Sequence, residues 1–462
     1  MIGDLKPYPD YKDSGLPWLG QVPAHWTVCR IKSILRELDR RTLDGRGTLL
    51  SLTRARGLIP HASRTDKAHS AGTLVGYKKY RSGEIVMNRM QAWNGMFGAG
   101  TMSGLVSPDY AVFKVMGEHR TALILERLKA PDLVARFAIE STGIGTGFNR
   151  LYTDQFGAIP IALPPLAEEA AIVHFLDWAN GRLERTVRAK RKVISLLTEQ
   201  RQAIIQRSVT RGLDTSVLLK PSEIPWLGDI PMHWETRRVK QASRILRGKF
   251  SHRPRNDPSL YDGAYPFIQT GVVAQAAKYI TSYSQTLNDK GLAVSRLFPS
   301  GTLVMTIAAN IGEVAVLTFD ACFPDSIVGF VPSQIADRDY LYFVFQCMKP
   351  ELLREAPVNT QGNLNVERIG AMGIPLPPIA EQTKIVQQIE ADVKRFDSFI
   401  DRLKREIDFL REYRTRLVAD IVTGKLDVRE AAARLPDIAE ADIGEGPADE
   451  SDAELAEEEA EA

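Results

Sequence analysis

The 462-residue sequence has little cysteine and no long apolar run. Its three cysteines, Cys29, Cys322 and Cys347, lie far apart and without the spacing of metal ligands, which suits a reducing cytoplasm. No stretch of eighteen apolar residues occurs and residues 1–20 are polar, so we expect no membrane span, no secretory signal and a cytoplasmic protein. The length predicts two to four domains.

Lysine and arginine are absent from residues 436–462, which contain twelve Asp and Glu residues. The whole chain has 59 basic and 57 acidic residues, so the other 45 acidic residues leave residues 1–435 with a net charge of +14. A segment rich in Ala, Glu and Asp and poor in large apolar groups is expected to be disordered. A basic body with an acidic tail is compatible with a nucleic-acid partner.

Catalytic motifs are also lacking. Residues 143–148 superficially resemble a phosphate-binding loop, but no Lys-Ser/Thr follows them, which favours a flexible turn. Residues 107–110 are close to the Asp/Asn-Pro-Pro-Tyr motif of amino-methyltransferases, but Asp109 occupies the second proline position and no glycine-rich cofactor loop lies upstream. We find no plausible metal site, nucleophile triad or nuclease carboxylate cluster. The sequence predicts a chain with no catalysis, metal or cofactor of its own.

Residues 163–214 and 376–427 are two copies of one stretch, and each copy is typical of a single long helix. Each begins with paired prolines followed by acidic residues and ends near a glycine, which are start and stop signals of helices. Apolar residues recur every seven positions in both copies, which predicts a coiled coil about 60 Å long. The polar residues that interrupt this pattern are Asn180, Lys190, Arg201 and Arg414, and an offset of 213 residues places Arg201 on Arg414. The alternative is two amphipathic helices packed on separate cores.

An opening motif, Pro-Trp-Leu-Gly followed by Pro-x-His-Trp, occurs at residues 17–26 and again at residues 225–234. We expect packing roles for its histidines, His25 and His233. The order of opening motif, globular region and helix therefore occurs twice, which indicates an internal repeat. If the two helices pair along their apolar seams, they run antiparallel with one globular region at each end.

The two globular regions, residues 27–162 and 235–375, resemble each other much less than the helices do. Short β-branched runs between Gly, Pro and Asn turns predict mixed, strand-rich folds, each with a late helix, near residues 120–128 and 338–348. The overall fold class is therefore α+β with a pseudo-twofold repeat. A similar framework with two different globular regions indicates two different binding functions.

Both globular regions contain basic clusters interleaved with amide side chains, which suit phosphates and base edges respectively. The alternative for each residue singly is a solvated loop charge. The candidate DNA-binding residues of the first region are Arg54, Arg56, Arg64, Lys67, Lys78, Lys79, Arg81, Arg89, Gln91 and Asn94. Those of the second region are Lys249, Arg253, Arg255, Asn256, Gln269, Thr270 and Asn310.

The duplicated pattern of opening motif, variable region, Ile-Pro-Leu-Pro-Pro-x-x-Glu-Gln and long helix resembles the specificity subunit of Type I restriction–modification enzymes. Residues 374–382 match this pattern closely. The first copy departs mildly, since Ile161-Ala162-Leu163 precedes its prolines and Glu169 replaces the glutamine. The resemblance covers residues 11 to 430 and leaves out the acidic tail.

The resemblance implies two target-recognition domains, each reading one half of a bipartite, asymmetric double-stranded DNA site, separated by two antiparallel helices. It also implies that the helices bind two methyltransferase (modification) subunits, which hold the S-adenosylmethionine site, and that restriction/translocase subunits complete the complex. The predicted domains are a first recognition domain (1–162), a first spacer helix (163–214), a second recognition domain (215–375), a second spacer helix (376–430) and an acidic disordered tail (431–462).

The alternative function is a structural adaptor whose globular regions bind protein partners. Neither the target sequence nor its gap length can be predicted from these residues.

Overall fold

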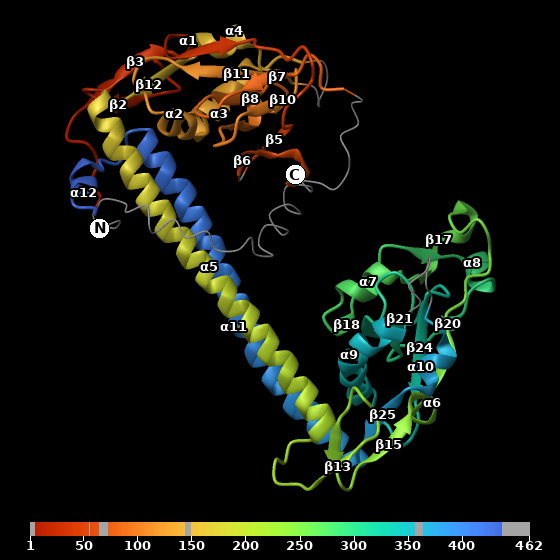
Figure 1. Cartoon of the computed structure of the whole chain (residues 1–462). Helices are drawn as coiled ribbons and strands as arrows, with labels where there is room; N and C mark the ends of the chain where they lie inside the picture. The colour runs from red at the N-terminus through yellow and green to blue at the C-terminus, as the bar shows by residue number, and fades with distance from the viewer. Residues whose placement is uncertain (1–4, 55, 64–72, 144–148, 356–363, 437–462) are drawn as a thin grey trace. The chain divides into compact units, whose positions relative to one another are not determined.

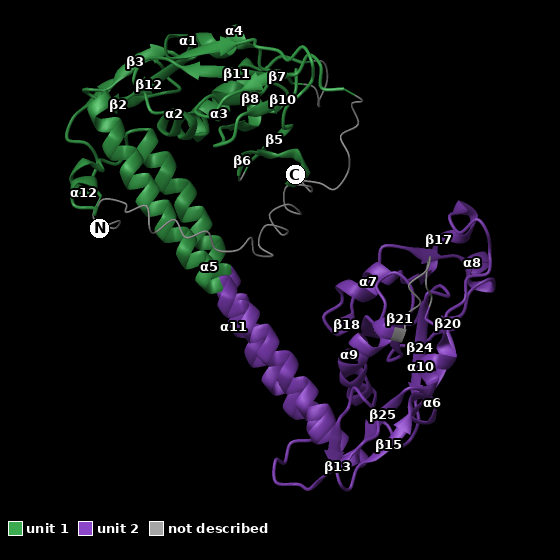
Figure 2. Ribbon diagram, in the orientation of Figure 1, with its two compact units in different colours: residues 1–190, 405–462 green, residues 191–404 purple. Residues whose placement is uncertain are grey.

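The computed structural model describes residues 5–54, 56–63, 73–143, 149–355 and 364–436. The chain forms two compact units: unit 1 contains residues 1–190 and 405–462, and unit 2 contains residues 191–404 (Figure 2). Two long helices, α5 (Leu166–Arg211) and α11 (Ile379–Val422), each belong partly to unit 1 and partly to unit 2 (Figure 1). The predicted division into five domains stays a prediction, and the acidic tail beyond Pro436 lies outside the described residues.

Unit 1 contains the first globular region and a short helix after α11. Its other elements are β1 (Tyr11–Asp13), β2 (Gln21–Pro23), β3 (Thr27–Arg30), α1 (Ile31–Ile34), β4 (Leu35–Leu38), β5 (Leu50–Thr53), β6 (Gly57–Pro60), η2 (His61–Ser63), β7 (Lys78–Tyr80), β8 (Ile85–Asn88), η3 (Ala92–Asn94), β9 (Phe97–Gly98), β10 (Gly104–Val106), β11 (Tyr110–Val115), α2 (Thr121–Leu128), α3 (Pro131–Glu140), α4 (Thr153–Ala158), β12 (Pro160–Leu163) and α12 (Arg429–Ala433).

Unit 2 contains the second globular region. Its other elements are β13 (Leu219–Pro221), β14 (Asp229–Pro231), β15 (Glu235–Arg238), α6 (Val239–Ala242), β16 (Ser243–Arg247), η4 (Pro258–Leu260), β17 (Tyr261–Pro266), α7 (Thr270–Gln275), β18 (Tyr279–Ile280), β19 (Thr286–Leu287), α8 (Asp289–Ala293), β20 (Leu297–Phe298), β21 (Leu303–Thr306), β22 (Val314–Leu317), β23 (Ala321–Cys322), β24 (Ile327–Pro332), α9 (Arg338–Glu355), α10 (Val366–Ala371) and β25 (Gly373–Leu376).

The central sheets of the two units have the same strand order. In unit 1 the order is β4-β11-β8-β9, and in unit 2 it is β16-β24-β21-β22 followed by β18. Neighbouring strands of the shared part are antiparallel in both units, whereas β18 is added parallel to β22. The pairs β1-β2 and β3-β12 recur as β13-β14 and β15-β25. The repeat predicted from the sequence is therefore a repeat of the fold, although the globular sequences differ.

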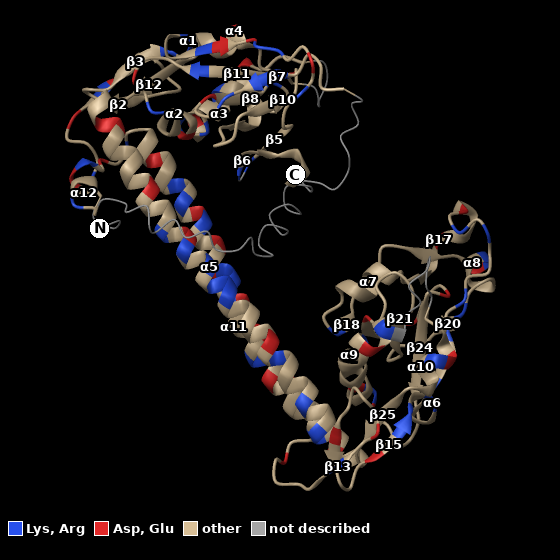
Figure 3. Cartoon of the chain, in the orientation of Figure 1, with Lys and Arg blue, Asp and Glu red and all other residues tan. Residues whose placement is uncertain are grey.

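Within each unit the segments of α5 and α11 run antiparallel, as their cross-helix pairs show. In unit 1, Arg414 Nη1 lies 3.4 Å from Glu184 Oε1, and Lys190 Nζ lies 2.5 Å from Glu406 Oε2. In unit 2, Arg201 Nε lies 3.4 Å from Asp397 Oδ1. Figure 3 shows charged residues of both signs along the two helices.

One pair of polar interruptions of the apolar seams, Arg201 and Arg414, is matched across the repeat. The offset of 213 residues places Arg201 on Arg414 and Glu184 on Asp397, so the two ion pairs are equivalent. Exposed ion pairs of this kind contribute less than about 1 kcal/mol each. Their main effect is to disfavour other registers of the two helices, because a shift would leave these charges against apolar side chains.

A buried carboxylate in the first turn of α5 joins three parts of unit 1. Glu168 Oε1 accepts hydrogen bonds from Trp26 Nε1 at 2.9 Å and from the Tyr8 hydroxyl at 2.6 Å, and Glu168 Oε2 lies 2.7 Å from His25 Nε2. Burial and the neighbouring Glu168 carboxylate raise the pKa of Tyr8, so its hydroxyl stays protonated and keeps donating. The turn that ends α11 contains Gly424, where an added Cβ would lie 3.2 Å from Trp26 Cη2 and 2.6 Å from a proline ring atom.

The same arrangement recurs in unit 2 with the helices exchanged. Glu381, in the first turn of α11, accepts a hydrogen bond from Trp234 Nε1 at 3.0 Å and lies 2.9 Å from His233 Nε2. Gly212, which ends α5, has a φ of +72°, and a Cβ there would lie 3.1 Å from the Trp234 indole. The sequence predicted packing roles for both histidines; each histidine also places a ring nitrogen at hydrogen-bonding distance from a helix carboxylate.

The residue that follows the helix carboxylate differs between the units: Glu169 follows Glu168 in unit 1, and Gln382 follows Glu381 in unit 2. Glu169 is fully buried; one of its oxygens lies 2.6 Å from His119 Nδ1 and the other accepts a hydrogen bond from the Arg120 backbone N–H. Gln382, its equivalent in unit 2, is also fully buried and donates to the carbonyls of Ile335 and Pro377 at 2.9 and 2.8 Å. A carboxylate thus replaces the amide where a histidine, rather than two carbonyls, faces it.

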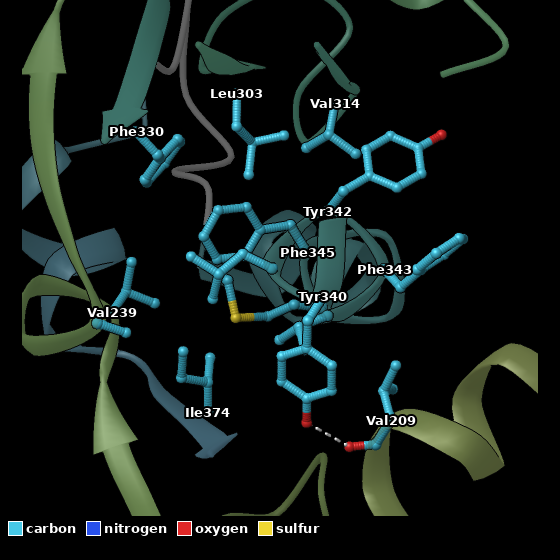
Figure 4. Packing of buried hydrophobic residues seen from close by; sticks show 14 of the residues in the cluster. Val209, Val239, Leu303, Val314, Phe330, Tyr340, Tyr342, Phe343, Phe345 and Ile374 are labelled. Carbon is cyan, nitrogen blue, oxygen red and sulfur yellow. Dashed lines mark hydrogen bonds between the residues drawn. The ribbon is translucent and has the colours of Figure 1, made fainter. Parts of the chain in front are cut away.

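Helix α9 forms the centre of the unit 2 core, as Figure 4 shows. Its buried Tyr340 donates a hydrogen bond to the Val209 carbonyl of α5 at 3.1 Å, and burial raises the pKa of this phenol well above its usual value. The rings of Phe330 of β24 and Phe345 of α9 pack in a tilted arrangement, with their centroids 4.7 Å apart. The core therefore links the central sheet of unit 2 to its segment of α5.

No helix among the described residues is both long and apolar enough to cross a membrane.

We expect Gln382→Glu to destabilise the protein by about 3 kcal/mol, because the new carboxylate would face two carbonyl oxygens without water. Glu169→Gln should cost less than about 1 kcal/mol, because an amide can still accept from the Arg120 N–H and donate to His119. Urea-unfolding midpoints of the two variants check this difference. Equal losses in both would contradict the assigned hydrogen-bond roles.

Candidate nucleic-acid interface

The turn that connects β8 to β9 presents polar side chains on the surface of unit 1. Gln91, Trp93 and Asn94 are exposed, and Arg54, in the loop between β5 and β6, donates to the Asn94 carbonyl at 3.3 Å. The structure therefore brings together residues that are forty positions apart in the sequence. Amide, aromatic and guanidinium groups on one surface can contact bases and phosphates.

Lys78, Lys79 and Arg89, three of the predicted DNA-binding residues of unit 1, differ in how exposed their side chains are to a possible phosphate contact. Lys79 is exposed, whereas the Lys78 side chain is 2% exposed and its ammonium lies 3.4 Å from Glu37 Oε1. Arg89 Nη2 donates to the same carboxylate at 2.6 Å. Burial and pairing argue against a phosphate contact by Lys78, because a contact would require breaking an internal ion pair.

The remaining basic candidates of unit 1 lie around these residues. Arg81 is exposed, and Arg56 is half-buried with its Nε and one Nη making no hydrogen bond to the described residues. Arg64 and Lys67 lie outside the described residues. Sequence reasoning missed Arg150, whose guanidinium packs on the β8–β9 turn at 3.4 Å from Met90 Sδ and pairs with Asp109 at 3.3 Å.

The basic cluster of unit 2 is organised by one carboxylate. Arg255 Nη2 lies 2.5 Å from Asp325 Oδ1, and Arg253 Nη2 lies 4.0 Å from Asp325 Oδ2. Arg253 also donates to the carbonyls of Phe250 and His252. The guanidinium groups are therefore held in place. Both side chains nevertheless remain about half exposed and can still donate hydrogen bonds to a phosphate.

The other candidates of unit 2 are spread over three elements. Lys249 and Asn256 are exposed in the loop after β16, and Gln269 is exposed but donates to Gln285 Oε1 at 3.0 Å. Thr270 is half-buried at the start of α7, and Asn310 is exposed in the turn between β21 and β22. Sequence reasoning missed the exposed Arg296, which donates to the Arg247 carbonyl at 3.3 Å.

Lys278 connects the second globular region to α11 and was not predicted. Its ammonium lies 2.5 Å from Glu390 Oε1 of α11 and 3.1 Å from Asp339 Oδ1 of α9. Burial opposes its charge, but the hydrogen bonds that Lys278 donates to Glu390 and Asp339 outweigh this and raise the pKa of Lys278. These ion pairs, in which Lys278 and Asp339 are half-buried and Glu390 is exposed, join the second globular region to its own segment of α11.

The described residues contain no group of three His, Cys, Asp or Glu side chains that could hold a metal ion. Burial raises the pKa of the Cys347 thiol to about 12 and also raises that of Cys322. Both thiols therefore stay protonated at neutral pH, and a protonated thiol is a poor nucleophile.

Comparisons with known proteins give a consistent result. Residues 231–408 match the family model of the Type I restriction modification DNA specificity domain. The MjaVIII specificity subunit of a Type I restriction enzyme from Methanocaldococcus jannaschii is 23% identical over 430 residues, covering 88% of this chain and 95% of that protein. The EcoKI specificity subunit of Escherichia coli K12 is 21% identical over 322 residues, covering 67% of this chain and 64% of that protein.

Among solved structures, a chain from work on complex assembly and conformational transition of the type I R-M system has a TM-score of 0.65 and 15% sequence identity. The likeness covers 88% of this chain and 99% of that one. At this identity it shows the fold, and it confirms the α+β class with two long helices.

Neighbouring lysines provide a test of which charges face a polyanion. A plot of log affinity for non-specific DNA against log salt concentration has a negative slope. We expect Lys79→Ala to make this slope shallower by about 0.9, the contribution of one phosphate contact. Lys78→Met should leave the slope unchanged, because the Lys78 ammonium is buried and neutralised by Glu37. Titrations at several salt concentrations measure both slopes, and a loss in Lys78→Met alone would contradict this arrangement.

Proposed function

We propose that this chain, a member of the Type I restriction modification DNA specificity family, binds double-stranded DNA at a bipartite, asymmetric site with one globular region on each half. The observation that carries the proposal is the shared strand order of the two central sheets, whose connecting turns present different exposed side chains. One framework with two different surfaces suits two unlike half-sites. Binding one half makes binding of the other intramolecular, which raises the overall affinity.

The predicted contact residues remain part of this proposal, with Lys78 left out because it is buried. Exposed basic side chains such as Lys79 and Arg255 suit phosphates, which position the protein on the duplex. Exposed amides such as Asn94 and Asn310 suit base edges. Sequence preference that survives competitor DNA would separate this function from that of a structural adaptor.

We also propose that the chain supplies no catalysis and that α5 and α11 bind two modification subunits, with restriction subunits completing the complex. Large apolar side chains exposed on the helices support a protein partner: Phe399 is 56% exposed in unit 2, and Phe409 is 67% exposed in unit 1. A groove of about 690 Å³ in unit 2 lies beside Phe399 and is lined from both helices by Leu197, Ile204 and Phe396, among others. An amphipathic helix of a partner could bury this surface.

Exchange of residues 30–150 for the equivalent region of a related subunit should change one half of the methylated DNA site and leave the other half intact. The reason is that the exchanged segment contains most of the first globular region and no part of α5 or of the second region. Methylation mapping in cells that contain the complete complex checks this. If both halves changed, or neither, the two-region model would be wrong.

Lengthening both helices should widen the gap between the half-sites. Lys190 and Glu406 pair across the helices, so four residues inserted after each would lengthen both helices at the same point along their axes. The added length is about 6 Å, which is nearly two base pairs at roughly 3.4 Å each. A control replaces four exposed residues of α5 without changing its length. Retained methylation with an unaltered gap would rule out the helices as the spacer.

A further inference from the structure

Two turns occupy the same place in the two globular regions. Residues 89–96 connect β8 to β9, and residues 307–313 connect β21 to β22, at matching positions of the two central sheets. The first carbonyl of each turn accepts a backbone hydrogen bond from an equivalent leucine: Leu151 donates to Arg89 at 3.0 Å, and Leu364 donates to Ile307 at 2.8 Å. Since the offset of 213 residues places Leu151 on Leu364, the repeated framework fixes both turns in the same way.

The first turn is held rigid by its own hydrogen bonds. Asn88 Nδ2 donates to Gln91 Oε1 at 3.0 Å, and Trp93 Nε1 donates to the Met90 carbonyl at 2.9 Å. Arg54 fixes the Asn94 carbonyl, and Gly95, at a φ of +77°, ends the short helix η3. A turn ordered before binding loses little conformational entropy when it meets a ligand.

The second turn is shorter and is also tightly bonded. The Thr306 hydroxyl donates to the Asn310 carbonyl, and the Gly312 N–H donates to the Thr306 carbonyl at 2.9 Å. Ala309 has a φ of +59°, a left-handed conformation that its Cβ disfavours. Strained backbone of this kind persists where the surrounding bonds enforce it, and it often lies at functional sites. Here it lies beside the exposed Asn310.

Each turn exposes the side chain of one asparagine, Asn94 in the first and Asn310 in the second. The side chains of Asn94 and Asn310 are exposed and form no hydrogen bond with the described residues, whereas Gln91 already accepts a bond from Asn88. An asparagine amide offers one acceptor and one donor group side by side, which match N6 and N7 of adenine in the major groove. Basic side chains nearby cannot supply this information, because phosphate contacts are the same for every sequence.

We propose that these two turns are the base-reading elements of the two globular regions and that Asn94 and Asn310 each recognise an adenine, one in each half-site. This inference rests on the proposed function, since it requires that each region binds one half of a bipartite DNA site. It goes further by assigning one residue and one base to each half.

The test is genome-wide methylation mapping in cells that contain the complete complex with the full-length chain. Asn94→Ala should reduce the preference for adenine at one position of the first half-site by about tenfold or more, and leave the second half unchanged. Asn310→Ala should do the same in the second half alone. A control variant, Gln202→Ala on the exposed surface of α5, should leave the methylated sequence unchanged.

Asn94→Asp and Asn310→Asp provide a second test that does not depend on residual activity of the alanine variants. A carboxylate of similar size can accept from cytosine N4 but cannot donate to adenine N7, so the preferred base should shift from adenine to cytosine at the same position. Thermal midpoints equal to that of the unchanged chain show that the variants fold.

The outcomes separate the two levels of the proposal. If the unchanged chain directs methylation to no bipartite sequence, the proposed function itself fails. If it does so and the variants at Asn94 and Asn310 keep the same sequence, the function stands and this inference is overturned. A change of the methylated sequence produced by Gln202→Ala, or a loss of preference at a position that is not adenine, would also overturn it.

Discussion

A carboxylate in the first turn of each long helix, buried at Glu168 and half-buried at Glu381, makes the interaction on which the rest of each unit depends. Glu168 and Glu381 accept hydrogen bonds from Trp26 and Trp234 of the two opening motifs. Hydrogen bonds to charged groups contribute about 1.5–3 kcal/mol each, so losing either indole would weaken the contact between the opening motif and the helix by an amount of that order. The glycine that ends the other helix lies against the same indole, so the start of one helix, the end of the other and the opening motif are fixed at one point in each unit.

Local differences between the units are accommodated around this shared framework. Glu169 is a carboxylate facing His119, whereas its equivalent Gln382 is an amide facing two carbonyls, and each is buried with suitable partners. The same framework supports connecting turns with different side chains. Sequence change is therefore costly at the framework, where a substitution leaves a buried polar group unpaired, and cheap at exposed turns, where it alters what the surface can recognise.

The repeat, the two long helices and the fold class could be predicted because they depend on local periodicity and constant offsets. The sequence could not predict which charged side chains are free to contact a phosphate and which are neutralised inside the fold. Lys78 looks like its exposed neighbour Lys79 in the sequence, but its partner Glu37 is 41 positions away and only the fold brings the two together. Asp325 likewise organises Arg255 from 70 positions away. For the same reason, the equivalence of the two connecting turns emerged from strand order and hydrogen bonds and not from their sequences, which differ.

We infer that this chain is a subunit that selects DNA sites for partners that carry out the chemistry. The most direct test is to map adenine methylation across a genome in cells with the modification subunits, with this chain present and with it deleted. We expect methylation at one asymmetric sequence of two separated parts when the chain is present, and loss of methylation at that sequence when it is deleted. Methylation of the same sequence without the chain, or a single uninterrupted site in its presence, would contradict the proposed function.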